Sequence, residues 1–143
     1  MEKDTINLLK ECDAGVKTAV NSIDEVLDDI KSEELRGIMN AARRAHQEIG
    51  DDIHAVLNSL EEKGKDPSPM ARAMSWMKIN WKMSEKPDDA TVADLMYDGC
   101  SMGVKSLTKY MNQYSGADAE SKRYAKKLIE AENTLMSDLK TFM

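Results

Sequence analysis

The sequence predicts an all-α protein built as a bundle of four long helices. Charged residues make up 32% of the 143 residues and aromatic residues only 5%, a composition that suits surface-charged helices better than sheets. In four long stretches, apolar residues recur every three or four positions, which is the spacing of one buried helix face. A chain of this length forms a core without disulfides or a structural metal. We therefore expect a single domain over residues 1–143.

A first helix is predicted from Asp4 or Thr5, either of which is a good N-cap residue. The predicted buried face of this helix comprises Ile6, Leu9, Asp13, Val16, Val20, Ile23, Leu27 and Ile30. Its one polar member is Asp13, which we expect to pair with a lysine such as Lys126 or Lys127, or to lie at a hydrated end of the bundle.

A second helix is predicted between Ser32 and Lys63, with Ser32 as its cap. Its buried face holds seven apolar residues and one histidine. The positions are Leu35, Met39, Ala42, His46, Ile49, Ile53, Val56 and Leu60. Because the connection to the first helix is so short, the two helices must form an antiparallel pair.

The residues Gly64 to Pro69 break this pattern and precede a shorter helix from Pro69 to about Met83, capped by Ser68. One face of this short helix is rich in methionine and tryptophan. It carries Met70, Met74, Met77 and Trp81, with Trp76 beside it. We expect this amphipathic helix to pack across the bundle; the alternative is a detached binding arm.

Two further long helices complete the bundle. The first runs from about Ala90 to Tyr114, and the second follows a turn and cap at Ser115 to Asp118. Their buried faces are Ala93, Met96, Cys100, Gly103, Leu107, Tyr110 and Tyr114, and then Ala125, Leu128, Glu132, Leu135, Leu139 and Phe142. A simple up-down bundle would not need the long link between the two pairs. We therefore predict the order up, down, crossover, down, up.

This arrangement resembles the ferritin-like superfamily, and more narrowly a branch of small bacterial ferritin-like proteins of unknown function. The resemblance covers nearly the whole chain and is carried by four groups of residues. They are Cys12-Asp13-Ala14-Gly15 with Ala19, Ala55 to Lys63, Ser75-Trp76-Met77-Lys78, and Gly103 with Tyr110. The resemblance implies a ferritin-like four-helix bundle with a crossover.

The metal-binding members of this superfamily hold two irons with paired Glu-x-x-His sequences and one further Glu from each remaining helix. Here Arg43 stands three residues before His46, and Leu135 stands three residues after Glu132. The other two carboxylate positions hold Val16 or Val20 and Gly103 or Val104. The resemblance therefore implies a degenerate di-iron site.

Counting along the helices places His46 and Glu132 at the same height, level with Thr18 and opposite Cys100 and Met102. Imidazole, carboxylate and thiolate suit zinc or a single ferrous ion, so the candidate metal ligands are His46, Glu132 and Cys100. The competing interpretation, which we prefer, is a buried hydrogen-bonded pair in which Arg43 helps to satisfy Glu132.

His54 forms an Asp-x-x-His spacing with Asp51, but it lies off the buried face. We expect it to be solvated.

The preferred functional prediction is a non-enzymatic structural or interaction module, linked to stress as the resemblance implies, without a cofactor and forming a homodimer. The alternative is a metal-binding or oxidase protein with a reduced iron or zinc site. A net charge of −6 and a pI near 5.0 argue against nucleic acid as a partner. The first residues lack the order of a signal peptide, and no apolar run approaches the ~20 residues that span a bilayer. We therefore expect a cytoplasmic protein with reduced cysteines and no integral membrane segment.

Overall fold

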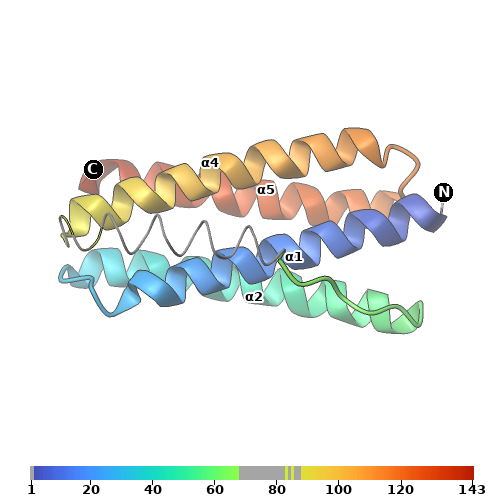
Figure 1. Cartoon of the computed structure of the whole chain (residues 1–143), viewed down its shortest axis with the longest axis horizontal. Helices are drawn as coiled ribbons and strands as arrows, with labels where there is room; N and C mark the ends of the chain where they lie inside the picture. The colour runs from blue at the N-terminus through green and yellow to red at the C-terminus, as the bar shows by residue number, and fades with distance from the viewer. Residues whose placement is uncertain (1, 68–82, 84, 86–87) are drawn as a thin grey trace.

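The computed structural model describes residues 2–67, 83, 85 and 88–143, and in these residues the chain is helical with no strand. The helices are α1 (Glu2–Leu27), α2 (Glu33–Ser59), α4 (Asp89–Gln113) and α5 (Ala119–Leu139), followed by the short 3-10 helix η1 (Lys140–Phe142). The predicted all-α class is confirmed, and the four long helices lie alongside one another as a bundle (Figure 1).

Side-chain contacts at the two ends of the bundle determine the direction of each helix. The Asp89 carboxylate accepts hydrogen bonds from the backbone N–H groups of Lys31 and Ser32, both at 2.9 Å, which places the start of α4 beside the turn between α1 and α2. At the opposite end, the Gly116 N–H donates to Asp4 at 2.9 Å, so the turn between α4 and α5 meets the start of α1. Accordingly, α1 and α5 run one way and α2 and α4 run the other (Figure 1).

Of the four predicted helix caps, two agree with the structure, one is wrong, and the fourth, Ser68, lies outside the described residues. Ser32 and Asp118 accept hydrogen bonds from backbone N–H groups in the first turns of α2 and α5. The predicted cap of the first helix is wrong, because α1 already begins at Glu2. Asp4 and Thr5 lie inside α1 and bind the α4–α5 turn instead, with Thr5 Oγ1 accepting from the Asp118 N–H at 2.8 Å.

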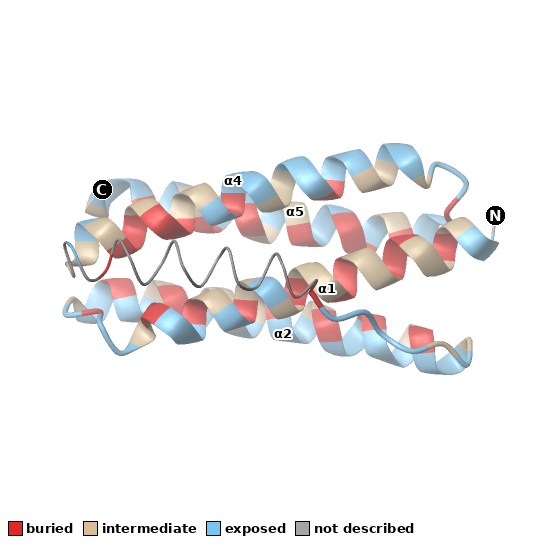
Figure 2. Cartoon of the chain, in the orientation of Figure 1, coloured by how far each residue is buried: buried red, intermediate tan, exposed pale blue. Residues whose placement is uncertain are grey.

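Buried side chains line the inner faces of all four helices and form two apolar clusters (Figure 2). One cluster lies near the α1–α2 turn and includes Met39, Cys100 and Leu135. The other includes Val16, Ile53 and Leu128. Along α2 and α5, His46 and Glu132 fall between residues of the two clusters. This pair therefore lies where the two parts of the core meet.

The predicted short helix from Pro69 to Met83, with Trp76 and Trp81, lies outside the described residues apart from its last position. Met83 is 8% exposed and belongs to the cluster near the α1–α2 turn. In the part of the chain that the structure describes, no helix is both long and apolar enough to span a bilayer.

Candidate functional site

The structure brings together the two polar residues that helix counting places at one height. His46 Nε2 lies 2.9 Å from Glu132 Oε1, and the two side chains are only 1% and 10% exposed. The other ring nitrogen, Nδ1, lies 2.7 Å from the carbonyl oxygen of Ala42. A carbonyl oxygen can only accept a hydrogen bond, so Nδ1 must carry a proton and donate it to Ala42. Nε2 is then the ring nitrogen that contacts the Glu132 carboxylate.

The surroundings of His46 favour its charged form. Burial lowers the pKa of the imidazole, but the hydrogen bond and charge of Glu132, together with the Ala42 carbonyl, outweigh burial and raise the pKa above its usual value. An imidazolium donates from both nitrogens, which matches the two acceptors present. The pair is therefore a buried ion pair with its donors satisfied.

Cys100 on α4 is the third member of this site. Burial raises the pKa of its thiol, and the charge of Glu132 and a hydrogen bond to that carboxylate raise it further. A Cβ placed on Gly103 would lie 3.5 Å from Glu132 Cδ, so the carboxylate packs directly against the backbone of α4. We call His46, Cys100 and Glu132 the central site.

Two expectations about the surroundings of the central site, those for Arg43 and Met102, are wrong. Arg43 does not reach Glu132; its Nε binds Asp24 Oδ1 on α1 at 2.8 Å. Met102 does not face the site, because it is 66% exposed. Thr18 is exposed as well, and its hydroxyl donates to the Ala14 carbonyl one turn earlier in α1 at 2.9 Å.

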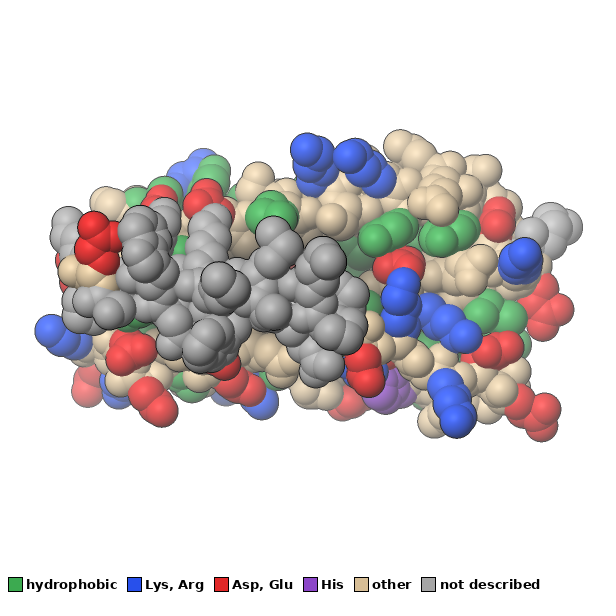
Figure 3. Space-filling model, viewed as in Figure 1, with side chains coloured by type: hydrophobic (Ala, Val, Ile, Leu, Met, Phe, Trp, Pro, Cys, Tyr) green, Lys and Arg blue, Asp and Glu red, His purple; other side chains and the backbone are tan. Residues whose placement is uncertain are grey.

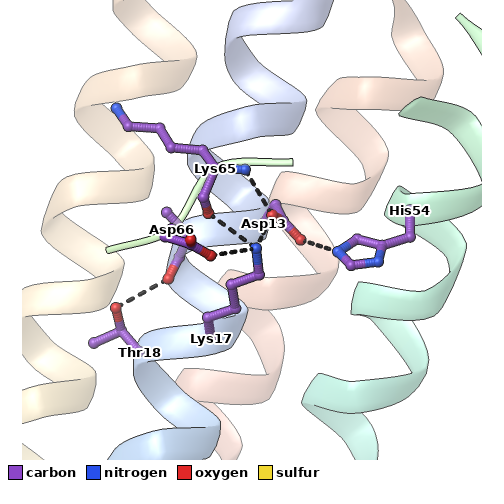
Figure 4. Close-up of polar contacts among 7 residues, drawn as sticks. Asp13, Lys17, Thr18, His54, Lys65 and Asp66 are labelled. Carbon is purple, nitrogen blue, oxygen red and sulfur yellow. Dashed lines mark hydrogen bonds and ion pairs between the residues drawn. The ribbon is translucent and has the colours of Figure 1, made fainter. Parts of the chain in front are cut away.

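A second polar cluster, which the sequence did not predict, surrounds Asp13 (Figure 4). Asp13 is 1% exposed, and its carboxylate contacts His54 Nε2 at 2.5 Å, Lys17 Nζ at 2.9 Å and the backbone N–H of Lys65 at 2.8 Å. His54 is half exposed, as expected for a residue off the buried face, but its ring reaches back to α1. We call these residues the Asp13 site.

Asp13 pairs with a lysine, as expected, but that lysine is Lys17 of its own helix and not one of the last helix such as Lys126 or Lys127. Lys126 and Lys127 are both exposed on α5. The carboxylate is instead satisfied by its own helix, by α2 and by the connection after α2. A sequence signal was present, since Lys17 stands four residues after Asp13, the spacing of an ion pair on one helix face.

The chemistry open to these two clusters is limited by their existing contacts. In the described part of the chain, no group of three or more His, Cys, Asp or Glu residues is arranged to hold a metal ion. In the central site the three candidate ligands bind one another. No buried side-chain nitrogen or oxygen of the described residues lacks a hydrogen-bond partner.

A hollow of about 410 Å³ lies at the start of α1, away from the central site, and it is open to solvent. Its lining is mostly charged and polar. The residues are Glu2, Lys3, Ile6, Asn7, Lys10 and Glu62. Unlike typical ligand sites, this hollow is neither enclosed nor apolar.

Comparison with known proteins adds no assignment, since no protein-family model, curated protein or solved structure matches the chain.

Proposed function

We propose that the protein is a ferritin-like bundle that acts as a structural or interaction module, with a central site that is an ion pair in place of a di-iron centre. The directions of the four helices support the ferritin-like part of this proposal. So does the position of His46 and Glu132 on facing helices, with Gly103 of α4 against the carboxylate.

The observation that carries the proposal is the direct contact between His46 and Glu132. The two atoms that would bind a metal are 2.9 Å apart and share a proton. Metal binding would require that proton to leave, together with the Cys100 proton, whose pKa is raised by burial and by Glu132. The direct contact and the raised pKa values of His46 and Cys100 support an ion pair at this site over a metal centre.

The alternative function is metal binding or oxidase activity at the same three residues. The observation in its favour is that the Glu132 carboxylate of α5 contacts both the His46 imidazole of α2 and the Cys100 thiol of α4. Zinc accepts all three ligand types, and a ferrous ion accepts imidazole and carboxylate. Under this alternative, the bound metal would replace the proton between His46 and Glu132 and the proton of the Cys100 thiol.

Metal content and metal-dependent stability separate the two functions. Protein purified without added metal is assayed for iron, zinc and manganese, and its melting temperature is measured with chelator, with zinc and, under anaerobic conditions, with ferrous iron. Our proposal predicts no stoichiometric metal and no rise in melting temperature, since only a ligand that binds the folded state stabilises it.

The chain offers a matched control for this experiment, because it contains two histidines. His46→Ala removes the candidate ligand, and His54→Ala removes the half-exposed imidazole outside the central site. A metal-dependent rise in melting temperature that His46→Ala abolishes and His54→Ala retains would overturn the proposal in favour of the metal-binding alternative.

The proposed module acts in the cytoplasm as a homodimer. On the face seen in Figure 3, acidic and basic side chains are interspersed between small hydrophobic patches, unlike the gathered cations of a nucleic-acid surface. Light scattering after size exclusion tests the dimer directly. A mass of 16.0 kDa, that of one chain, across the accessible concentration range would contradict it.

A further inference from the structure

The Asp13 carboxylate binds the connection that follows α2 as well as its own helix. Its Oδ2 accepts the Lys65 N–H at 2.8 Å. Gly64 lies so close that a Cβ at this position would be 2.3 Å from the same oxygen. Figure 4 shows the connection crossing α1 at this point. Residues Gly64, Lys65 and Asp66, here called the strap, therefore cover a carboxylate that is 1% exposed.

The strap itself is held by polar contacts at the surface. Lys17 Nζ bridges Asp13 and Asp66, at 2.9 Å from each, and lies 3.4 Å from the Lys65 carbonyl. The Lys65 ammonium pairs with Glu11. All three strap residues are exposed. Because water competes for exposed polar contacts, those of Lys17 with Asp66 and the Lys65 carbonyl, and that of the Lys65 ammonium with Glu11, each contribute little to stability.

The helices beneath the strap are held in a different way. Around Asp13, α1 buries Leu9, Cys12 and Val16, which are 0 to 4% exposed and belong to one apolar cluster with residues of α2, α4 and α5. These contacts do not involve the strap. Regions held by few apolar contacts open at a lower free energy than the core does.

We propose that the strap is a conformational device that opens while the bundle stays folded, with Asp13 as its latch. Opening breaks the bond between the Lys65 N–H and Asp13 Oδ2 and exposes the Asp13–His54 pair to solvent. Lys17 and His54 remain beside the carboxylate, so its charge stays compensated after opening. This inference goes beyond the proposed function and does not depend on whether the central site binds metal.

Hydrogen exchange at the Lys65 amide measures the latch, because this amide donates directly to Asp13. In the parent protein we expect this amide to exchange faster than amides inside α1 and α2. Asp13→Ala removes the acceptor and should accelerate Lys65 exchange about ten- to a hundredfold, the equivalent of one hydrogen bond to a charged group. Core amides such as that of Leu57 should keep their rates.

A second variant tests the latch from the strap side and leaves Asp13 in place. Gly64→Ala introduces a methyl group that collides with the carboxylate, so it should accelerate Lys65 exchange as well. The matched control is Gly37→Ala, because Gly37 has no atom within 4 Å of its Cβ position. Adding Gly64→Ala to Asp13→Ala should give little further acceleration, since the methyl group then has no carboxylate to displace.

Two results would overturn the proposal. In one, the Lys65 amide of the parent protein exchanges at the rate of the α1 and α2 core amides, which would mean that the strap opens only with the whole bundle. In the other, both variants fold and leave Lys65 exchange unchanged, which would mean that Asp13 does not hold the strap.

Discussion

The central site and the Asp13 site each pair a histidine with a carboxylate, but water reaches them differently. In the central site both partners are enclosed, with His46 1% and Glu132 10% exposed. In the Asp13 site the carboxylate is 1% exposed and His54 is 52% exposed. The same two residue types therefore form a dehydrated pair in one place and a half-hydrated pair in the other.

This difference in exposure determines how much each pair contributes to the free energy of unfolding. A buried charge that loses its partner has no water to replace it, so breaking such a pair is costly. In the Asp13 site, the half-exposed imidazole is solvated when the contact breaks, and the buried carboxylate keeps Lys17 and the Lys65 N–H as partners, so the contact contributes less. We infer that His46 and Glu132 hold the two halves of the core in register, whereas Asp13 and His54 lie where the exposed connection after α2 can separate from α1.

The largest expected effect comes from removing the acceptor of the central site. Glu132→Leu leaves the His46 imidazole and the Cys100 thiol without their carboxylate. We expect the free energy of unfolding to fall by about 3 to 5 kcal/mol, the range for breaking a buried pair. Urea unfolding measures this value. Glu132→Gln keeps the shape and an acceptor oxygen, so it should cost less.

The matched substitution in the Asp13 site is His54→Ala. Because this imidazole is half exposed, its loss should cost about 1 kcal/mol or less. If His54→Ala and Glu132→Leu lowered the free energy of unfolding equally, the distinction between the two sites would be wrong.

The central site was predictable from sequence because a helix advances by a constant amount per residue. Counting from the helix turns correctly placed His46 and Glu132 at one height. Counting carries less information about the direction of a long side chain, so Arg43 was assigned to Glu132 although it binds Asp24. The positions of residues along the bundle axis were thus more predictable than the contacts that their side chains make.

The Asp13 site was not predictable because two of its partners depend on features that have no periodicity. The Lys65 N–H is a backbone group on an irregular connection, and the path of that connection is not encoded in a repeating pattern. His54 lies off the buried face, so the helical pattern did not indicate that its ring contacts Asp13. Lys17 alone had a helical spacing that indicated the contact.

The stability of the protein should also depend on pH through His46. The folded-state pKa of His46 is raised, so the ion pair contributes fully below about pH 6.5, the ordinary value for histidine, and this contribution is lost as pH rises through the folded pKa. We expect the free energy of unfolding to fall as the pH rises above about 6.5. Below about 8.5, thiols stay largely protonated and do not interfere.

His46→Gln is the control for the pH experiment, because it removes the titrating group and keeps a polar side chain. Its free energy of unfolding should fall less over the same range. Parallel pH profiles for the parent protein and His46→Gln would show that the central site is not the source of the pH dependence.

The third prediction concerns Gly50, which stands one turn after His46 and one turn before His54 on α2. A Cβ at Gly50 would lie 2.8 Å from Val16 Cγ1, so α1 and α2 approach closely between the two sites. Gly50→Ala should therefore lower the free energy of unfolding by about 1 to 3 kcal/mol through overpacking. Urea unfolding provides the measurement.

The control for Gly50→Ala is Gly37→Ala on the same helix, where nothing lies near the Cβ position. There the substitution should raise the free energy of unfolding by about 0.5 to 1 kcal/mol, since alanine loses less conformational freedom than glycine in a helix. A gain at both positions would mean that the close approach of α1 and α2 relaxes without cost.

The smallest expected effect is at Glu61, which follows the C-cap of α2 and precedes the strap. Glu61 has a φ of 56°, in the left-handed region that favours glycine. The N–H of Glu62 bonds to the Leu57 carbonyl at 2.9 Å, and that of Glu61 bonds to the Asn58 carbonyl at 3.0 Å, which is the Schellman pattern of helix ends.

Glu61→Gly should raise the free energy of unfolding by about 0.5 to 1 kcal/mol, because it relieves a left-handed conformation and this gain is partly offset by the entropy of glycine. The matched control is Lys63→Gly, at an exposed neighbouring position without a positive φ, where glycine should give no gain. Lys65 exchange should stay unchanged in Glu61→Gly, because the bond between Asp13 and the strap is intact. A stability gain accompanied by slower Lys65 exchange would instead show that the end of α2 and the strap open as one unit.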